Sequence, residues 1–116
     1  MGMAATEYKQ ANSRIGPIVT ELRQRLEKLH RDRLHSMLLY GSRARGDDEM
    51  DSDIDVLVVL NGPVNPAEEI ARTSHMVADL SLKNDVVLSC LFISADRYAA
   101  EQSPLILNVR REGVAV

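Results

Sequence analysis

The chain has 116 residues, of which 45% are hydrophobic and 27% are charged. These proportions are typical of a folded globular protein, and the length suits a single hydrophobic core. The net charge is −3, the 14 basic residues are dispersed among 17 acidic ones, and only 3% of residues are aromatic. Without a basic stripe or an aromatic stacking platform, duplex DNA binding and base stacking on single strands are not expected as the main activity.

Cysteine content and hydropathy predict where the protein works. Cys90 is the one cysteine, and it lies in the apolar run "VVLSCLF". An internal disulfide is therefore impossible, which fits a reducing compartment. No apolar run approaches the roughly 20 residues of a membrane span, and no signal-peptide pattern is visible. We expect a cytoplasmic protein with no membrane partner.

The first third of the chain is expected to be helical. Residues up to about Ser13 are typical of an amphipathic or fraying helix, and a second helix begins near Gly16-Pro17, since proline is tolerated in a first helical turn. We expect His30, near its end, to lie among surface charges. A period of 3.6 residues predicts one buried face for this helix, formed by Ile15, Ile18, Val19, Leu22, Leu26 and Leu29.

Three apolar runs predict β-strands, at residues 34–40, 53–60 and 85–94. Turn signals bound them, such as the Asn-Gly-Pro that follows the second run. Short helical segments are expected around residues 95–102 and 105–112, and the closing "VAV" is expected to add an edge strand. The order of elements predicts an α+β fold in which helices flank a small mixed sheet.

A further helix has an explicit start between the second and third strands. Asn65 is a suitable N-cap, Pro66 suits the first helical position, and Glu68 stands three residues after the cap, as in a capping box. We expect this helix to continue to about Leu82. Its inner face is expected to be narrow and made of small residues, namely Ala67, Ile70, Ala71, Ser74, Val77 and Ala78.

The stretch "GDDEMDSDID" carries five aspartates and a glutamate just before the second strand. A Walker-type phosphate loop is excluded, because no Gly-Lys-Ser/Thr follows the glycines. Asp51, Asp53 and Asp55 match positions 1, 3 and 5 of an EF-hand loop. However, Val56 replaces the glycine at position 6, and Gly62 replaces the glutamate at position 12. The acids before Asp53 are interpreted as a solvated loop.

Asp53 and Asp55 call for another interpretation. Residues two apart on a strand point to the same face, so these two carboxylates converge. They repel each other unless a cation lies between them, and oxygen ligands suit Mg²⁺ or Mn²⁺. Asp85 begins the third apolar run. If that strand lies beside the second, Asp85 completes a cage of three carboxylates.

The end of the first strand suggests what this metal site would serve. Gly41 allows close backbone approach, and the Ser42 hydroxyl with neighbouring main-chain N–H groups can hold a phosphate. Arg43 and Arg45 add positive charge on the same side, or else form salt bridges with the acidic loop. A phosphate-binding turn that faces a divalent-metal cage has the groups that nucleotidyl transfer requires.

Gly41-Ser42, ten intervening residues and Asp53-Ile54-Asp55 resemble the G-S-x10-D-x-D signature of the DNA polymerase β-like nucleotidyltransferase superfamily. The fuller string "YGSRARGDDEMDSDIDVLVVL" and the carboxyl-terminal "SPLILNVRREGVAV" resemble its minimal nucleotidyltransferase (MNT) family. The resemblance is strongest over residues 34–116. It implies a single minimal nucleotidyltransferase domain over residues 1–116.

The resemblance also implies a function. Many MNT proteins are antitoxins of a HEPN-domain ribonuclease toxin and transfer AMP from ATP to a tyrosine of that toxin. By position, Asp53, Asp55 and Asp85 would be the catalytic residues and the ligands of a two-metal Mg²⁺ site. Gly41 and Ser42, with Arg43 and Arg45, would bind the nucleotide. The implied partner is the toxin, in a hetero-oligomer, with no direct nucleic-acid partner.

Two other functions fit the same motif. One is transfer to a small molecule such as an aminoglycoside, which is disfavoured because little sequence follows the third strand to build an acceptor pocket. The other is a non-catalytic antitoxin that blocks its toxin by binding alone. The intact aspartates disfavour this second alternative, since a binding surface does not require clustered carboxylates.

Overall fold

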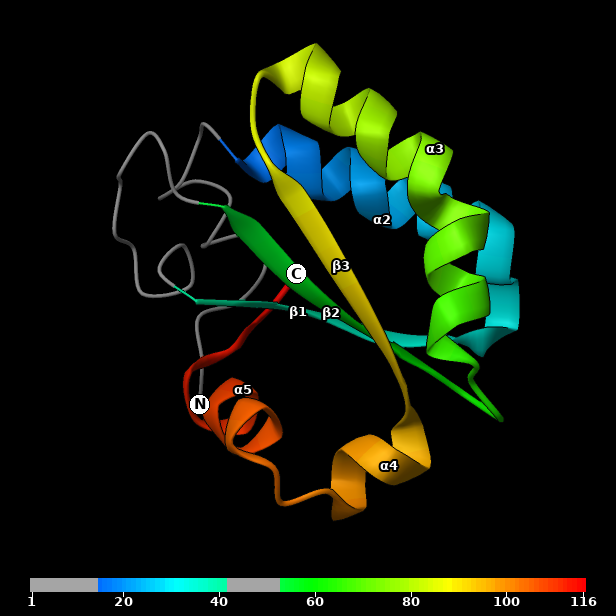
Figure 1. Cartoon of the computed structure of the whole chain (residues 1–116), viewed down its shortest axis with the longest axis vertical. Coiled ribbons are helices and arrows are strands. Elements are labelled where there is room, and N and C mark those ends of the chain that lie inside the picture. The colour runs from blue at the N-terminus through cyan, green and yellow to red at the C-terminus, as the bar shows by residue number, and fades with distance from the viewer. Residues whose placement is uncertain (1–14, 42–52) are drawn as a thin grey trace.

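The computed structural model describes residues 15–41 and 53–116. The helix expected up to Ser13 and the acidic loop therefore lie outside the described residues. A four-stranded sheet carries helices on both faces (Figure 1). In chain order the elements are α2 (Gly16–His30), the 3-10 turn η1 (Arg31–Arg33), β1 (Leu34–Tyr40), β2 (Ile54–Leu60), α3 (Pro66–Asn84), β3 (Leu88–Ser94), α4 (Ala95–Ala100), α5 (Pro104–Glu112) and β4 (Val114–Ala115).

The sheet is mixed, and its strand order is β3-β2-β1-β4. β1 runs antiparallel to both β2 and β4, whereas β3 runs parallel to β2. α3 makes the crossover between the two parallel strands, as such a connection requires. Figure 1 shows α2 and α3 on one face of the sheet and α4 and α5 at the other. The α+β fold with a small mixed sheet is confirmed, as is the terminal edge strand.

Two strand starts differ from the sequence prediction. β2 begins at Ile54, so Asp53 immediately precedes the strand. β3 begins at Leu88 rather than at Asp85, because α3 extends to Asn84 and Asp85 is its C-cap. Asp85 has φ 52° and ψ 49°, and its N–H donates to the Leu82 carbonyl at 3.4 Å. Left-handed caps of this kind are common where helices end, and aspartate tolerates them better than most residues.

The helix α2 supplies the centre of the main core. Leu22 and Leu26 are fully buried against the sheet, and Leu29, which was predicted to join them, is 42% exposed. The rest of the predicted face is confirmed. Other buried members of this core come from β1, β2, α3 and β3, and they include Met37, Leu39, Ile54, Val56, Val58, Leu60, Leu80, Leu88 and Phe92.

The predicted inner face of α3 is wrong. Most of its small residues are exposed, and Ile70 is 46% exposed. The buried residues are instead Glu69, Thr73 and Leu80. Glu69 can be buried because its carboxylate lies 2.7 Å from Nε2 of His30, itself buried rather than at the surface as predicted. A pair of polar side chains in the core thus sets the rotation of α3.

Two glycines make left-handed turns at the ends of β1 and β2. Gly41 follows β1 with φ +78°, and Gly62 follows β2 with φ +83°. A Cβ placed on Gly41 would lie 2.9 Å from Oδ2 of Asp55, whereas a Cβ on Gly62 would meet nothing within 4 Å. The backbone at Gly41 therefore lies directly against the Asp55 carboxyl.

This difference makes the two glycines a matched pair. We expect Gly41→Ala and Gly62→Ala to lose a similar free energy of unfolding, about 1–2 kcal/mol, because both force alanine into left-handed backbone. Only Gly41→Ala should move the Asp55 carboxyl, which NMR detects as a changed Cγ chemical shift and titration. An unchanged Asp55 signal in Gly41→Ala would show that the close approach has no consequence.

Candidate active site

The acid pair lies at the start of β2. Asp53 is exposed just before the strand, and Asp55 is its second residue. Across the sheet Asp55 is in register with Tyr40 on β1 and with Ser89 on β3. Because alternate residues share a face, this row lies on the α4–α5 side, where Tyr40 packs against the apolar cluster that contains Leu57.

The electrostatics of the pair favour a cation. Burial, and then the neighbouring Asp53 carboxylate, raise the pKa of Asp55 above its usual range. Burial, followed by the charges of Asp55 and Cys90, raises the pKa of Tyr40 to about 12, so this phenol stays neutral. An ion placed between the two carboxylates would remove their repulsion and compensate for burial. The donor set, two carboxylate groups, suits Mg²⁺ or Mn²⁺.

The turn at Gly41 connects the pair to the predicted phosphate-binding segment. Because glycine lacks a Cβ, the chain passes against Asp55 Oδ2 and then continues into Ser42. The structure thus brings Gly41, Asp53 and Asp55 to one corner of the sheet. Ser42, Arg43 and Arg45 lie outside the described residues, so their roles stay predictions.

Asp85 is not brought into this group. It is exposed at the end of α3, three residues before Leu88, which is the register partner of Ile54. Over residues 15–41 and 53–116, no three His, Cys, Asp or Glu side chains form a cluster that could hold a metal ion. The acid pair could still bind Mg²⁺, since this ion is commonly held by one or two carboxylates together with substrate phosphates.

Ser89 is the site neighbour that sequence reasoning missed. Its Cα is paired with that of Asp55, which places its hydroxyl-bearing side chain on the same face of the sheet. Only the register of β3 against β2 reveals this, because no motif marks the serine. Tyr40, the register partner of Asp55 on β1, packs against the apolar cluster on the α4–α5 side of the sheet.

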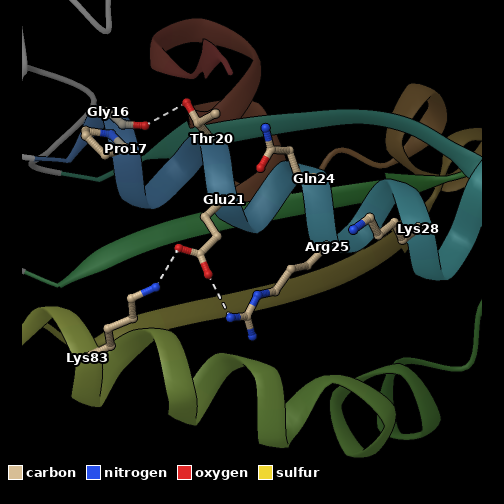
Figure 2. A pocket seen from close by; sticks show the side chains of 8 residues that line it. All are labelled: Gly16, Pro17, Thr20, Glu21, Gln24, Arg25, Lys28 and Lys83. Atoms are coloured by element: carbon tan, nitrogen blue, oxygen red, sulfur yellow. Dashed lines mark hydrogen bonds and ion pairs between the residues drawn. The ribbon is translucent and has the colours of Figure 1, made fainter.

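A cavity of about 820 Å³ lies elsewhere, beside α2, and Lys83 of α3 completes its lining (Figure 2). Glu21 accepts hydrogen bonds there from Arg25 at 2.7 Å and from Lys83 at 3.1 Å. Arg25 also donates to Asp79 at 3.0 Å. These charges neutralise one another and connect the two helices on the sheet face opposite Asp55. The cavity is therefore not a candidate for the chemistry of the acid pair.

No helix within the described ranges is both long enough and apolar enough to cross a bilayer.

Comparisons with known proteins place this geometry in context. A protein of Methanocaldococcus jannaschii named "Putative protein adenylyltransferase" is 31% identical over 72 residues, which are 62% of this chain and 72% of the relative. A toxin–antitoxin crystal structure with AMP-PNP superposes with a TM-score of 0.56 at 21% identity, over 78% of this chain and 66% of that one. This chain thus spans just under two thirds of the chain that it matches in the toxin–antitoxin structure.

A crystal structure from Sulfolobus solfataricus, described as that of a putative nucleotidyltransferase, gives a TM-score of 0.55 at 20% identity. It matches 99% of this chain, which spans 87% of that one, so the likeness covers the fold as a whole. The sequence profile of the nucleotidyltransferase domain matches residues 19–102, from α2 through the acid pair to α4. The chain belongs to the nucleotidyltransferase domain family.

Proposed function

We propose that this protein transfers AMP from ATP to a tyrosine hydroxyl of a HEPN-domain ribonuclease toxin and thereby acts as its antitoxin. The observation that carries the proposal is the corner formed by Gly41, Asp53 and Asp55, where the backbone turn lies against a metal-suited carboxylate. The name of the M. jannaschii relative and the AMP-PNP in the toxin–antitoxin structure support adenylyl transfer to a protein.

In this proposal Asp53 and Asp55 hold divalent ions, with Mg²⁺ as the natural ion and Mn²⁺ as a substitute. Bound metal would lower the pKa of the attacking hydroxyl and neutralise the triphosphate. We propose that the N–H groups of the turn that begins at Gly41 and the Ser42 hydroxyl bind the phosphates, and that Arg43 and Arg45 add positive charge there.

The proposed transfer is a nucleophilic displacement at the α-phosphorus of ATP. The acceptor oxygen forms a bond to the α-phosphorus, the bond from that phosphorus to the bridging oxygen breaks, and pyrophosphate leaves. The hydroxyl proton passes to a carboxylate, and Asp85 is proposed as this base and third carboxylate. Because Asp85 is exposed at the end of α3, this role requires it to approach the pair when nucleotide binds.

Nucleotide binding should depend on metal. We expect ATP to raise the melting temperature only when Mg²⁺ or Mn²⁺ is present, because ligands that bind the folded state stabilise it by mass action. Differential scanning fluorimetry with ATP, with and without EDTA, measures this. Equal stabilisation by ATP in excess EDTA would contradict a nucleotide held through a metal ion.

Replacing Asp53 or Asp55 by asparagine should have different effects on the stability of the protein and on its transfer activity. The pKa of Asp55 is higher in the folded state than in the unfolded state. The free energy of unfolding of the metal-free protein therefore falls as pH rises from the unfolded-state pKa to the folded-state pKa. Asp55→Asn should therefore melt at or above the wild-type temperature at neutral pH without metal. Its transfer activity, and that of Asp53→Asn, should fall by orders of magnitude.

Asp85→Asn is the companion variant for this test. If Asp85 is the base, transfer should fall while the metal-dependent stabilisation by ATP persists, since the pair still holds the ion. Transfer near the wild-type rate in both Asp53→Asn and Asp55→Asn would remove the proposed site. If Asp85→Asn transfers AMP at the wild-type rate, Asp85 is not the base, and Asp53 and Asp55 suffice for the reaction.

The acceptor can be identified directly. If a HEPN-domain protein is encoded beside this chain, we expect incubation with [α-³²P]ATP and Mg²⁺ to label a tyrosine of that protein, with little label on aminoglycosides or on this chain. Toxin inhibition should then persist after the two proteins are separated, because the modification is covalent. Inhibition that disappears on separation, with no mass increase on the partner, would favour occlusion alone.

A further inference from the structure

The strand β3 is an edge of the sheet, and its sequence lacks the usual protection of an edge. Among the strands of residues 15–41 and 53–116, β2 is the one that pairs with it, so its other side has no partner strand there. Its seven residues, "LSCLFIS" from Leu88 to Ser94, include no charged residue and no proline. Natural proteins commonly protect exposed edges with charges, prolines or bulges, because unpaired strands recruit other strands. This edge is therefore suited to pairing with another strand.

The hydrogen-bonding direction along β3 follows from two contacts. Ile54 N–H donates to the Val87 carbonyl at 2.8 Å, so the backbone groups of Val87 point toward β2. Backbone direction alternates along a strand, so the groups of even-numbered residues point to the open side. Leu88 N–H agrees, since it donates to Oγ of Ser81 at 3.2 Å on the α3 side.

Two residues therefore present both backbone groups to the open edge, Cys90 and Phe92. Within residues 15–41 and 53–116, no turn, loop or side-chain hydrogen bond reaches their N–H or carbonyl groups. An N–H donor and a carbonyl acceptor at each of two alternate residues form half of an antiparallel ladder. A strand with the same spacing would satisfy all four groups.

The surface beside this edge is uncharged as well. A groove of about 390 Å³ runs between β3 and α3, and Ile70, 46% exposed, is among its residues. The described residues that line the groove carry no charge, so an identical surface would meet no like-charge repulsion from them. Its lining consists of Ile70, Thr73, Ser74, Val77, Ala78, Leu88, Ser89, Cys90 and Leu91.

We propose that β3 pairs antiparallel with β3 of a second copy of this chain, about a two-fold axis at Leu91. Cys90 of one copy then exchanges two hydrogen bonds with Phe92 of the other, and the two Leu91 residues face each other as a non-hydrogen-bonded pair. The two four-stranded sheets become one continuous sheet. An axis at Cys90 would instead require Leu88 N–H, which Ser81 already occupies.

The two-fold arrangement leaves both acid pairs open. Asp55 lies beside the start of β3, through its pairing with Ser89, and an antiparallel partner strand runs the opposite way. The two pairs thus lie toward opposite ends of the joined strands, where each could meet an acceptor independently. The dimer does not depend on the proposed transfer reaction, and the tests below do not measure transfer.

Cysteine cross-linking tests the register. In a Cys90→Ala background, Leu91→Cys should form a disulfide-linked dimer on mild oxidation, because opposed residues of a non-hydrogen-bonded pair have Cα atoms about 4.5 Å apart. Ser89→Cys in the same background is the matched control. Its two copies are staggered by four residues, about 13 Å along the strands, and should not cross-link.

Sedimentation velocity tests the dimer itself. The wild type should sediment as a dimer at micromolar concentration, and Cys90→Pro should shift it to monomer, because proline removes an N–H on the open side while the ladder to β2 is kept. Circular dichroism checks that this variant folds. If it does not fold, the cross-links decide the question.

Two outcomes would overturn the proposal. One is a monomeric wild type together with no cross-link from Leu91→Cys. The other is equal cross-linking from Ser89→Cys and Leu91→Cys, which would indicate random collision rather than the proposed register.

Discussion

The position of β2 between β1 and β3 determines how the rest of this molecule is arranged. Residues Val56 to Leu60 are buried on both faces of the sheet, which leaves the start of the strand as the place where its charged residues can reach water. Charge is costly inside the sheet, so Asp53 and Asp55 lie at that boundary. No described side chain of opposite charge relieves the repulsion between the two carboxylates, and this repulsion favours the binding of a cation from solvent.

A second constraint is the buried contact between His30 and Glu69, which joins the end of α2 to α3 at 2.7 Å. Arg33 and Arg72 approach the other Glu69 oxygen at 3.8 and 3.9 Å, so the carboxylate keeps favourable charges around it. Removing one partner of such a pair generally costs more than the pair contributes, because the other partner stays buried. This contact fixes α3, and through α3 the groove beside β3.

Much of this architecture could be predicted from periodicity and spacing. The strand at residues 34–40, the Asn65 cap and the inner face of α2 follow from local patterns, and Asn65 does accept a hydrogen bond from Glu68 N–H at 3.3 Å. The rotation of α3 could not be predicted, since apolar periodicity gives no weight to a buried glutamate that finds its partner 39 residues away.

The start of β3 was equally inaccessible from the sequence. Asp85-Val86-Val87 has the composition of a strand, and only the helix end shows that Asp85 takes a left-handed cap conformation instead. The third carboxylate was predicted from its nearness to an apolar run, whereas its place depends on where the preceding helix stops. The motif around Gly41 and Asp55 is more robust, because it joins two strands that pair directly.

Strand β4 can join the sheet only late in the synthesis of the chain. β4 pairs with β1, Val116 N–H donates to the Met37 carbonyl, and the guanidinium of Arg23 donates to the carbonyl of Val116. Residues 114–116 leave the ribosome after the other three described strands, so until then β1 lacks β4 as a partner at one edge. Closing that edge joins segments that are far apart in sequence, a step that loop-closure entropy slows. The nascent chain therefore completes its sheet only after the residues around Val116 have emerged from the ribosomal tunnel.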